Sequence, residues 1–120
     1  MKKKTTSDPR AKAKKLLGMI LDKHPQEPMV LDLRNLNLIW DFFIVVSSGS
    51  GPHARAMAEG LNKSAKNDGI PLHHIENDEE DNWFLLDYND VCVHIFSEEK
   101  RAFYSLEQLF KDAKKVRFRY

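Results

Sequence analysis

The sequence predicts a single α/β domain in which a mixed sheet of about five strands is flanked by three helices. The first observation is the run 91–96, VCVHIF, which is mostly apolar on both faces of an extended strand. Such a strand is typical of a sheet interior that is covered on both sides. The second observation is that stretches with helical spacing of apolar residues alternate with short β-branched or aromatic runs. A chain of 120 residues is long enough to bury one such core.

The first element is a helix that begins near Pro9 and ends before Pro25. Proline suits the first helical position, and either Ser7 or Asp8 is expected to cap the helix. Pro25 disfavours helical backbone in the residue before it. Residues 1–8 are expected to form a flexible basic arm. The apolar stripe of the helix consists of Ala13, Leu16, Leu17, Ile20 and Leu21.

Two strands are expected next, at 29–33 and 42–46, and the second of them is strongly apolar. It runs into the turn sequence SSGSGP at 47–52, where a second helix begins. Ser50 is a suitable cap for this helix, and Gly69 is a suitable left-handed residue at its end. The buried stripe of the second helix is predicted to be Ala54, Met57, Ala58, Leu61 and Ala65.

A strand at 70–76 and then a β-hairpin are predicted after the second helix. The hairpin strands are 83–87 and 91–96. Asn89 and Asp90 lie in the turn between them, and both residue types tolerate the left-handed backbone that a tight turn requires. The hairpin is therefore placed at the centre of the fold.

A last helix is expected after Ser97, so the α/β domain spans 9–113 and is followed by a basic, aromatic tail at 114–120. The stripe of this helix is Ala102, Phe103, Leu106, Leu109, Phe110 and Ala113. The core is predicted to include Ile44, Val46, Leu61, Leu85, Val93, Ile95 and Leu106.

Charge is distributed unevenly along the chain, although the net charge is only +1. Residues 76–90 hold seven acids and no Lys or Arg, whereas both ends are basic. The near-zero net charge gives no general sign of nucleic-acid binding. Two interpretations of the basic ends stay open: a secondary electrostatic contact with RNA phosphates, or ordinary solvated charge.

The single cysteine, Cys92, lies in the predicted core strand and leaves no partner for a disulfide within the chain. A reducing compartment is therefore expected. No apolar segment approaches the length that crosses a membrane. We expect a cytoplasmic protein that does not bind a membrane.

No catalytic residue, cofactor site or metal site is predicted. The SSGSGP turn has no Lys after it and lacks the full dinucleotide-binding pattern, so a structural turn is favoured over an anion site. A Gly-Ser pair before a helix is also found in nucleotidyltransferases, but the next acid is Glu59, far into the helix. His73 and His74 are neighbours on a strand and point to opposite faces, which disfavours a shared metal ion.

The acidic hairpin is the most informative candidate for function. Trp83, Asp87, Tyr88 and Asp90 combine two large aromatic residues with carboxylates around one turn. Aromatic anchors among charges are typical of binding hot spots. Negative charge favours a basic protein partner.

Two blocks of the sequence resemble one family. They are DFFIVVSSGS at 41–50 and WFLLDYNDVCVHIF at 83–96, the second continuing into the Phe-Tyr-x-Leu-Glu run at 103–107. These blocks are similar to the ribosomal silencing factor family, also called the RsfS or Iojap family, and the similarity covers about residues 10–111. One departure is Asn89, where a glycine is usual, and Asn can still adopt a left-handed turn.

The resemblance implies a small domain related in fold to nucleotidyltransferases, with no known catalysis or cofactor. It implies binding to ribosomal protein L-fourteen on the large ribosomal subunit, which blocks joining of the small subunit and represses translation under nutrient limitation. It also implies a possible homodimer. Asp41 and Tyr104, which lie in the matching blocks, join the expected partner surface. The alternative hypothesis is a nucleotide-binding or nucleotidyltransferase-like enzyme on the same fold.

Overall fold

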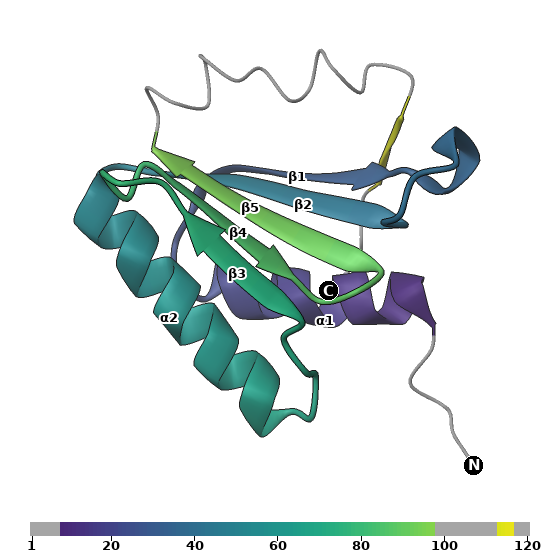
Figure 1. Cartoon of the computed structure of the whole chain (residues 1–120), viewed down its shortest axis with the longest axis horizontal. Coiled ribbons are helices and arrows are strands. Elements are labelled where there is room, and N and C mark those ends of the chain that lie inside the picture. The colour runs from purple at the N-terminus through teal and green to yellow at the C-terminus, as the bar shows by residue number, and fades with distance from the viewer. Residues whose placement is uncertain (1–7, 98–112, 117–120) are drawn as a thin grey trace.

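The computed structural model describes residues 8–97 and 113–116. This part of the chain forms a six-stranded mixed sheet with two helices packed against one face (Figure 1). The sequence predicts an α/β domain with a mixed sheet, and this fold class is confirmed. The expected third helix falls on residues 98–112, outside the described residues. Neither described helix combines the length and apolar character needed to cross a membrane.

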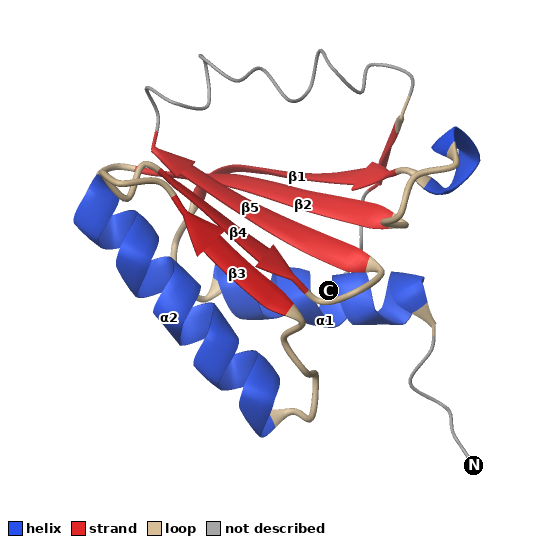
Figure 2. Cartoon of the chain, viewed as in Figure 1, coloured by secondary structure: helices blue, strands red, loops and turns tan. Residues whose placement is uncertain are grey.

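The elements follow the predicted order (Figure 2). The helices are α1 (Pro9–Leu21) and α2 (Gly51–Asn67), and a short 3₁₀ helix covers Arg34–Leu36. The strands are β1 (Gln26–Asp32), β2 (Phe42–Ser48), β3 (His74–Asn77), β4 (Trp83–Asp87), β5 (Val91–Ser97) and β6 (Lys114–Val116).

The sheet is built around the parallel pair β2 and β5. The strand order is β3-β4-β5-β2-β1-β6, and all other neighbouring strands are antiparallel. Ile44 pairs with Val93, and Val46 pairs with Ile95. Every residue of β2 and β5 is buried, as expected for strands covered on both faces. The predicted sheet interior is therefore confirmed.

The main core lies between the sheet and the two helices. Apolar side chains of α1 and α2 pack on alternate residues of the strands, because successive strand residues point to opposite faces. Of the predicted core, Leu85 is only half-buried and Leu106 lies outside the described residues. The other predicted members are fully buried: Ile44, Val46, Leu61, Val93 and Ile95.

A smaller apolar cluster occupies the opposite face of the sheet. We call this side the second face. Its buried members are Leu31, Leu33, Phe43, Val45, Cys92 and Phe96, with Trp40, Trp83 and Leu85 partly buried beside them. Burial also raises the pKa of the Cys92 thiol, as expected for a cysteine in a core strand.

Local signals fixed the starts of both helices, the end of α2 and the hairpin turn. Asp8 caps α1 by accepting a hydrogen bond from the Arg10 amide at 3.0 Å. Ser50 caps α2 through the His53 amide at 3.2 Å. Gly69 and Asn89 both have positive φ, 77° and 79°, as predicted for a helix end and a tight turn.

β2 and β5 end slightly later than predicted, at Ser48 and Ser97, and larger differences concern β1, β3 and β6. β1 begins at Gln26 because a bulge, with Glu27 at φ 47°, carries the pairing past Pro28. The strand expected at 70–76 covers only His74–Asn77, because the Ile70 amide still bonds to the end of α2 and its side chain is buried in the core. Residues 114–116 of the expected tail form β6, which pairs with β1 and adds a sixth strand.

Candidate partner-binding surface

The alternation of β4 separates its residues into two groups. Phe84 and Leu86 point into the main core, whereas Trp83, Leu85 and Asp87 lie half-buried on the second face. We call Trp83, Leu85 and Asp87 the β4 stripe. It combines an indole, an aliphatic side chain and a carboxylate along one strand, beside the edge strand β3.

The indole of Trp83 is held in one orientation. Its ring lies almost parallel to that of Phe96, with centroids 5.7 Å apart, and to the imidazole of His94 at 6.1 Å. Its Nε1 donates a hydrogen bond to Nδ1 of His94 at 3.2 Å. Trp83 is therefore a preorganised aromatic group, which loses little side-chain entropy on binding.

His94 supports the indole as a neutral imidazole. Because Nδ1 accepts the indole hydrogen bond, the proton of the neutral ring resides on Nε2, for which no hydrogen-bond partner is found among the described residues. Burial lowers the pKa of His94 from its ordinary 6.5 to about 4. His94 therefore positions Trp83 by accepting the hydrogen bond of its indole.

A depression of about 440 Å³ adjoins the stripe. Its walls are formed by the edge strand β3, the β4 stripe and the loop 78–82 between β3 and β4, which we call the acidic loop. Its lining residues are Glu76, Asn77, Asp78, Trp83 and Leu85. Carboxylates beside an indole attract a cationic side chain through charge and through the ring face. The depression is therefore suited to a Lys or Arg of a partner.

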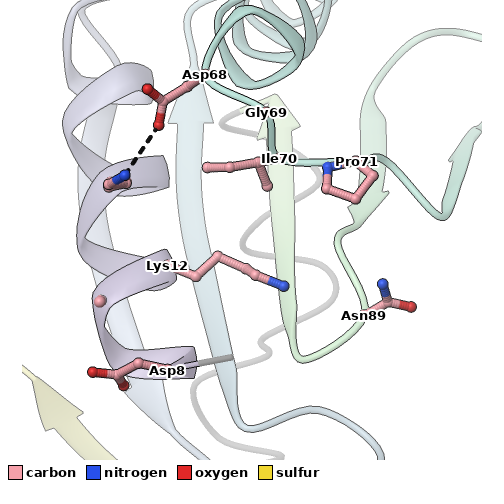
Figure 3. Close-up of a pocket in the computed structure, with 9 residues that line it drawn as sticks. Asp8, Lys12, Asp68, Gly69, Ile70, Pro71 and Asn89 are labelled. Atoms are coloured by element: carbon pink, nitrogen blue, oxygen red, sulfur yellow. Dashed lines mark ion pairs between the residues drawn. The ribbon is translucent and has the colours of Figure 1, made fainter. Parts of the chain in front are cut away.

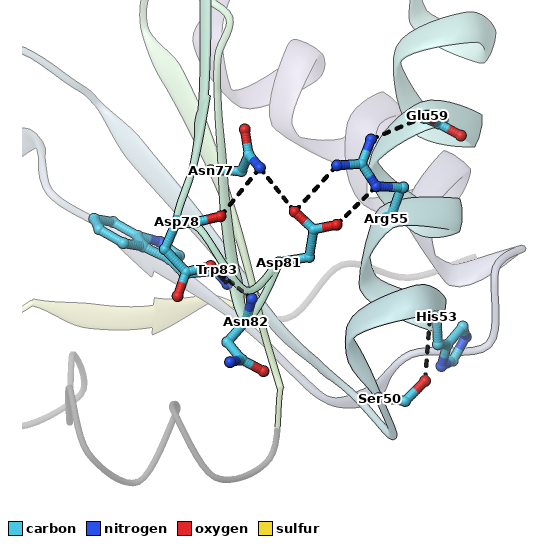
Figure 4. A network of polar contacts seen from close by, with 9 residues as sticks. All are labelled: Ser50, His53, Arg55, Glu59, Asn77, Asp78, Asp81, Asn82 and Trp83. Carbon is cyan, nitrogen blue, oxygen red and sulfur yellow. Dashed lines mark hydrogen bonds and ion pairs between the residues drawn. The ribbon is translucent and has the colours of Figure 1, made fainter.

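The acidic loop before β4 is tied to α2 (Figure 4). The Arg55 guanidinium donates two hydrogen bonds to Asp81, at 2.8 and 3.1 Å, and Asn77 donates to the same carboxylate at 2.8 Å. The hydrogen bond from Arg55 also lowers the pKa of Asp81. Asp81 is thus a structural carboxylate whose charge is already paired.

A second carboxylate fixes the beginning of β4. Asp78 accepts hydrogen bonds from the amides of Asn82 at 2.6 Å and Trp83 at 3.2 Å (Figure 4). Such a side-chain-to-backbone arrangement stabilises a turn. The network therefore determines where Trp83 enters the sheet.

The carboxylates at the other end of the hairpin have different partners. Asp87 accepts hydrogen bonds from Nε1 of Trp40 at 3.2 Å and from the amide of Asn89 at 2.8 Å. Asp90 forms an ion pair with Lys12 of α1 at 2.6 Å. Asp41 is half-buried, and its amide donates to the carbonyl of Asp90 at 2.7 Å. The charge of Asp90 is therefore neutralised by Lys12, whereas Asp87 accepts hydrogen bonds from neutral donors and remains part of the β4 stripe.

The structure corrects the expectation that the Tyr88 side chain faces a partner. Tyr88 is fully buried in the main core, because it continues the inward alternation of Phe84 and Leu86. Burial raises the pKa of its phenol, and the hydroxyl has no hydrogen-bond partner among the described residues. Tyr104, the other aromatic residue of the expected surface, lies outside the described part.

The SSGSGP turn forms hydrogen bonds with the first turn of α2. The Gly49 amide donates to Nδ1 of His53 at 3.4 Å, and the Ser50 carbonyl accepts from the Ala54 amide at 3.0 Å. Together with the Ser50 cap, these bonds support the structural interpretation of the turn. Within residues 8–97 and 113–116, no three His, Cys, Asp or Glu side chains gather as a metal site.

A second depression, of about 480 Å³, lies between α1, the connection after α2 and the hairpin turn (Figure 3). Lys12 extends across it and is bound by Asp90 and by the carbonyl of Tyr88 at 3.0 Å. Lys15 is paired with Asp68 at 3.3 Å. Both lysines are therefore engaged within the chain.

Sequence reasoning placed Trp83 and Asp87 on the surface and missed Leu85 as a half-exposed neighbour. Strict alternation from Trp83 would have identified Leu85 and excluded Tyr88. No short-range signal links Arg55 to Asp81 or Trp40 to Asp87, because these contacts join distant segments.

Comparison with known proteins identifies the family. The model of the family described as "Ribosomal silencing factor during starvation" matches residues 6–119. The chain is 37% identical over 95 residues to the ribosomal silencing factor RsfS of Halalkalibacterium halodurans, covering 79% of this chain and 81% of that protein. It is 33% identical over 92 residues to RsfS of Bacillus subtilis, covering 77% and 78% of the two chains.

A crystal structure of a Bacillus halodurans protein shares the fold. Its TM-score is 0.79 at 29% identity, and the alignment covers 91% of this chain and 99% of that chain. The family model, the relatives and the common architecture agree over most of the sequence. The chain therefore belongs to the ribosomal silencing factor (RsfS) family.

Proposed function

We propose that this protein binds the large ribosomal subunit through ribosomal protein L-fourteen, blocks joining of the small subunit and so represses translation under nutrient limitation. Family membership supports a role in regulating translation at the ribosome. In this proposal the protein acts by occupying a surface and catalyses no reaction. Its expected location is the cytoplasm, where ribosomes work.

The observation that carries the proposal is the β4 stripe with its adjoining depression. Trp83 supplies a rigid aromatic surface, and Leu85 adds apolar area that a partner can cover. Glu76 and Asp87 supply negative charge on the same face, since Glu76 pairs with Leu85 across the sheet. A basic ribosomal protein offers complementary charge to this surface.

Each hairpin carboxylate has a distinct role in this proposal. Asp87 belongs to the contact surface, and Asp41, which is outside the hairpin, directly precedes β2. Asp90 acts indirectly, because its pair with Lys12 secures the hairpin turn to α1. Tyr88 acts from the core by supporting the strand that carries the stripe.

Sedimentation with separated ribosomal subunits tests the proposal. The wild-type chain is expected to pellet with large subunits, to bind purified L-fourteen and to prevent the subunits from joining. Glu76→Lys combined with Asp87→Lys reverses both charges beside the stripe. This variant is expected to bind large subunits about tenfold or more weakly. Because it also loses the hydrogen bonds that Asp87 accepts from Trp40 and Asn89, its melting temperature is expected to fall, and binding is measured well below that temperature.

The matched control is Asp22→Lys combined with Glu27→Lys. It makes the same change in net charge at two exposed residues, one after α1 and one on β1, three strands away from β4 in the sheet. It is expected to bind like the wild type. Absence of binding by the wild-type chain would refute the function. Equal loss in both variants would show that only net charge matters.

Two secondary contacts complete the proposal. The basic ends are assigned to ribosomal RNA, so removal of residues 1–6 should reduce the salt dependence of binding with a small effect on affinity. We assign the homodimer to protein that is not bound to a ribosome, and sedimentation equilibrium measures whether it forms. A salt dependence unchanged by truncation would contradict the RNA contact.

A further inference from the structure

Two neighbouring aliphatic side chains are exposed on the loop between the 3₁₀ helix and β2. Ile39 is 83% exposed and Leu38 is 42% exposed. Single exposed apolar residues are common on protein surfaces. Here, however, two of the three large hydrophobic residues that are exposed in the described part are adjacent, and Trp40 follows them directly. We call Leu38 and Ile39 the loop tip.

The loop is braced on both sides of its tip. Before the tip, Asn37 adopts a left-handed conformation with φ 54° and ψ 40°. After it, the Trp40 indole packs against Phe43, with ring centroids 5.4 Å apart, and donates its hydrogen bond to Asp87. The Leu33 amide also closes the loop by bonding to the carbonyl of Asp41 at 2.8 Å. The tip is therefore preorganised, and less entropy is lost when it binds.

The charges around the tip indicate what kind of surface it meets. Asp41 follows the loop in sequence, and Asp87 is bonded to Trp40 at its base. Neither carboxylate forms a salt bridge with any described residue, although the Arg34 guanidinium, which is paired with Asp32, also interacts electrostatically with Asp41. Asp90, in contrast, is paired with Lys12. The negative charge of Asp41 and Asp87 opposes approach to phosphates or to an anionic membrane. It favours a basic protein surface.

We propose that the loop tip is an apolar anchor that inserts into a recess on the same basic protein that covers the β4 stripe. The inference rests on the proposed function and extends its contact surface. The bond between Trp40 and Asp87 joins the loop to the stripe, so one partner can cover both. Leu38 and Ile39 supply desolvated area, and Asp41 and Asp87 supply complementary charge at its edge.

Replacement of the two aliphatic residues tests the anchor. Leu38→Asn combined with Ile39→Asn replaces exposed apolar side chains by polar ones, so the melting temperature is expected to stay the same or rise. Affinity for large ribosomal subunits and for purified L-fourteen is expected to fall about tenfold or more. Ile75→Asn is the matched control, because Ile75 is 44% exposed but lies on β3 and points away from the second face. Its affinity is expected to change less than about twofold, as for a residue outside an interface.

The possible results separate the two proposals. If the Glu76→Lys and Asp87→Lys pair loses binding while the loop-tip variant binds like the wild type, the anchor is refuted and the function stands. If the wild type fails to bind large subunits, both fall, since the anchor takes its partner from that function. Binding of the wild type to anionic phosphatidylserine vesicles, lost in the loop-tip variant, would overturn the assignment to a protein.

Discussion

The indole nitrogen of Trp83 lies 3.2 Å from Nδ1 of His94, so one strand of the hairpin donates a hydrogen bond to a buried imidazole on the next. The bond requires Nδ1 to be unprotonated. His94 sits beneath the β4 stripe between Phe43 and Phe96, whose ring centroids lie 4.5 and 6.0 Å away. A half-buried tryptophan is therefore supported by a group that the fold keeps neutral.

The stability of the fold is expected to decrease in mild acid because of His94. Burial lowers its pKa to about 4, against 6.5 for an ordinary histidine, so the unfolded chain binds the proton more readily. This contribution is complete above pH 6.5, is lost as the pH falls toward 4, and changes no further below it. The loss in the free energy of unfolding is about 3 kcal/mol. Urea titrations between pH 7.5 and 4 measure it.

One variant isolates this contribution from the titration of the carboxylates. His94→Phe removes the titrating group and keeps an aromatic ring, so its stability should depend much less on pH over this interval. If the wild type and His94→Phe lose stability in parallel, His94 is not the responsible group.

Tyr88→Phe is expected to stabilise the fold slightly. The Tyr88 hydroxyl is buried without a hydrogen-bond partner among the described residues, so its removal relieves a desolvation penalty of about 1 kcal/mol. Tyr88→Ala, in contrast, should destabilise by about 3–5 kcal/mol, as for other large aromatic residues in cores. Binding to large subunits by Tyr88→Phe should equal that of the wild type. A stability loss above about 1 kcal/mol would reveal a bonded hydroxyl.

Arg55→Ala is expected to loosen the acidic loop and weaken partner binding. Arg55 holds Asp81, and the same loop positions the amides of Asn82 and Trp83 on Asp78. Hydrogen exchange at those two amides should accelerate by about tenfold when the hydrogen bonds between Arg55 and Asp81 are lost. Glu59→Gln removes the other acidic partner of Arg55, at 3.6 Å, without touching the loop, and should leave exchange unchanged. Equal exchange rates in Arg55→Ala and the wild type would show that the loop keeps its conformation without Arg55.

Ile95→Ala tests the central strand. Ile95 is fully buried opposite Val46, so truncation should reduce the free energy of unfolding by about 2–5 kcal/mol. Ile75→Ala removes the same atoms from an exposed position on the edge strand and should change stability by less than about 0.5 kcal/mol. Denaturant titration of both variants gives the comparison. Similar losses would mean that β5 is not the centre of the core.

The sequence by itself determined the central strands of the sheet and the positions of the helix caps and the hairpin turn. Residues 91–96 are mostly apolar on both faces and residues 42–46 are strongly apolar, which is typical of a covered central position, and both runs lie inside the buried strands β5 and β2. Asp8, Ser50, Gly69 and Asn89 act through their own backbone or through residues three or fewer positions away. Signals of this range are legible in sequence because they do not depend on the rest of the fold.

Only the tertiary structure decided which hairpin residues are available to a partner. Tyr88 and Asp87 are neighbours in sequence, yet one is buried in the core and the other lies on the second face. Arg55 neutralises Asp81, and Lys12 neutralises Asp90, through contacts between distant elements. The amino-acid composition does not distinguish Asp81 and Asp90, which are paired with cations, from Asp87. Their exposure and pairing depend on which elements pack together, and that is fixed only when the whole sheet and its helices assemble.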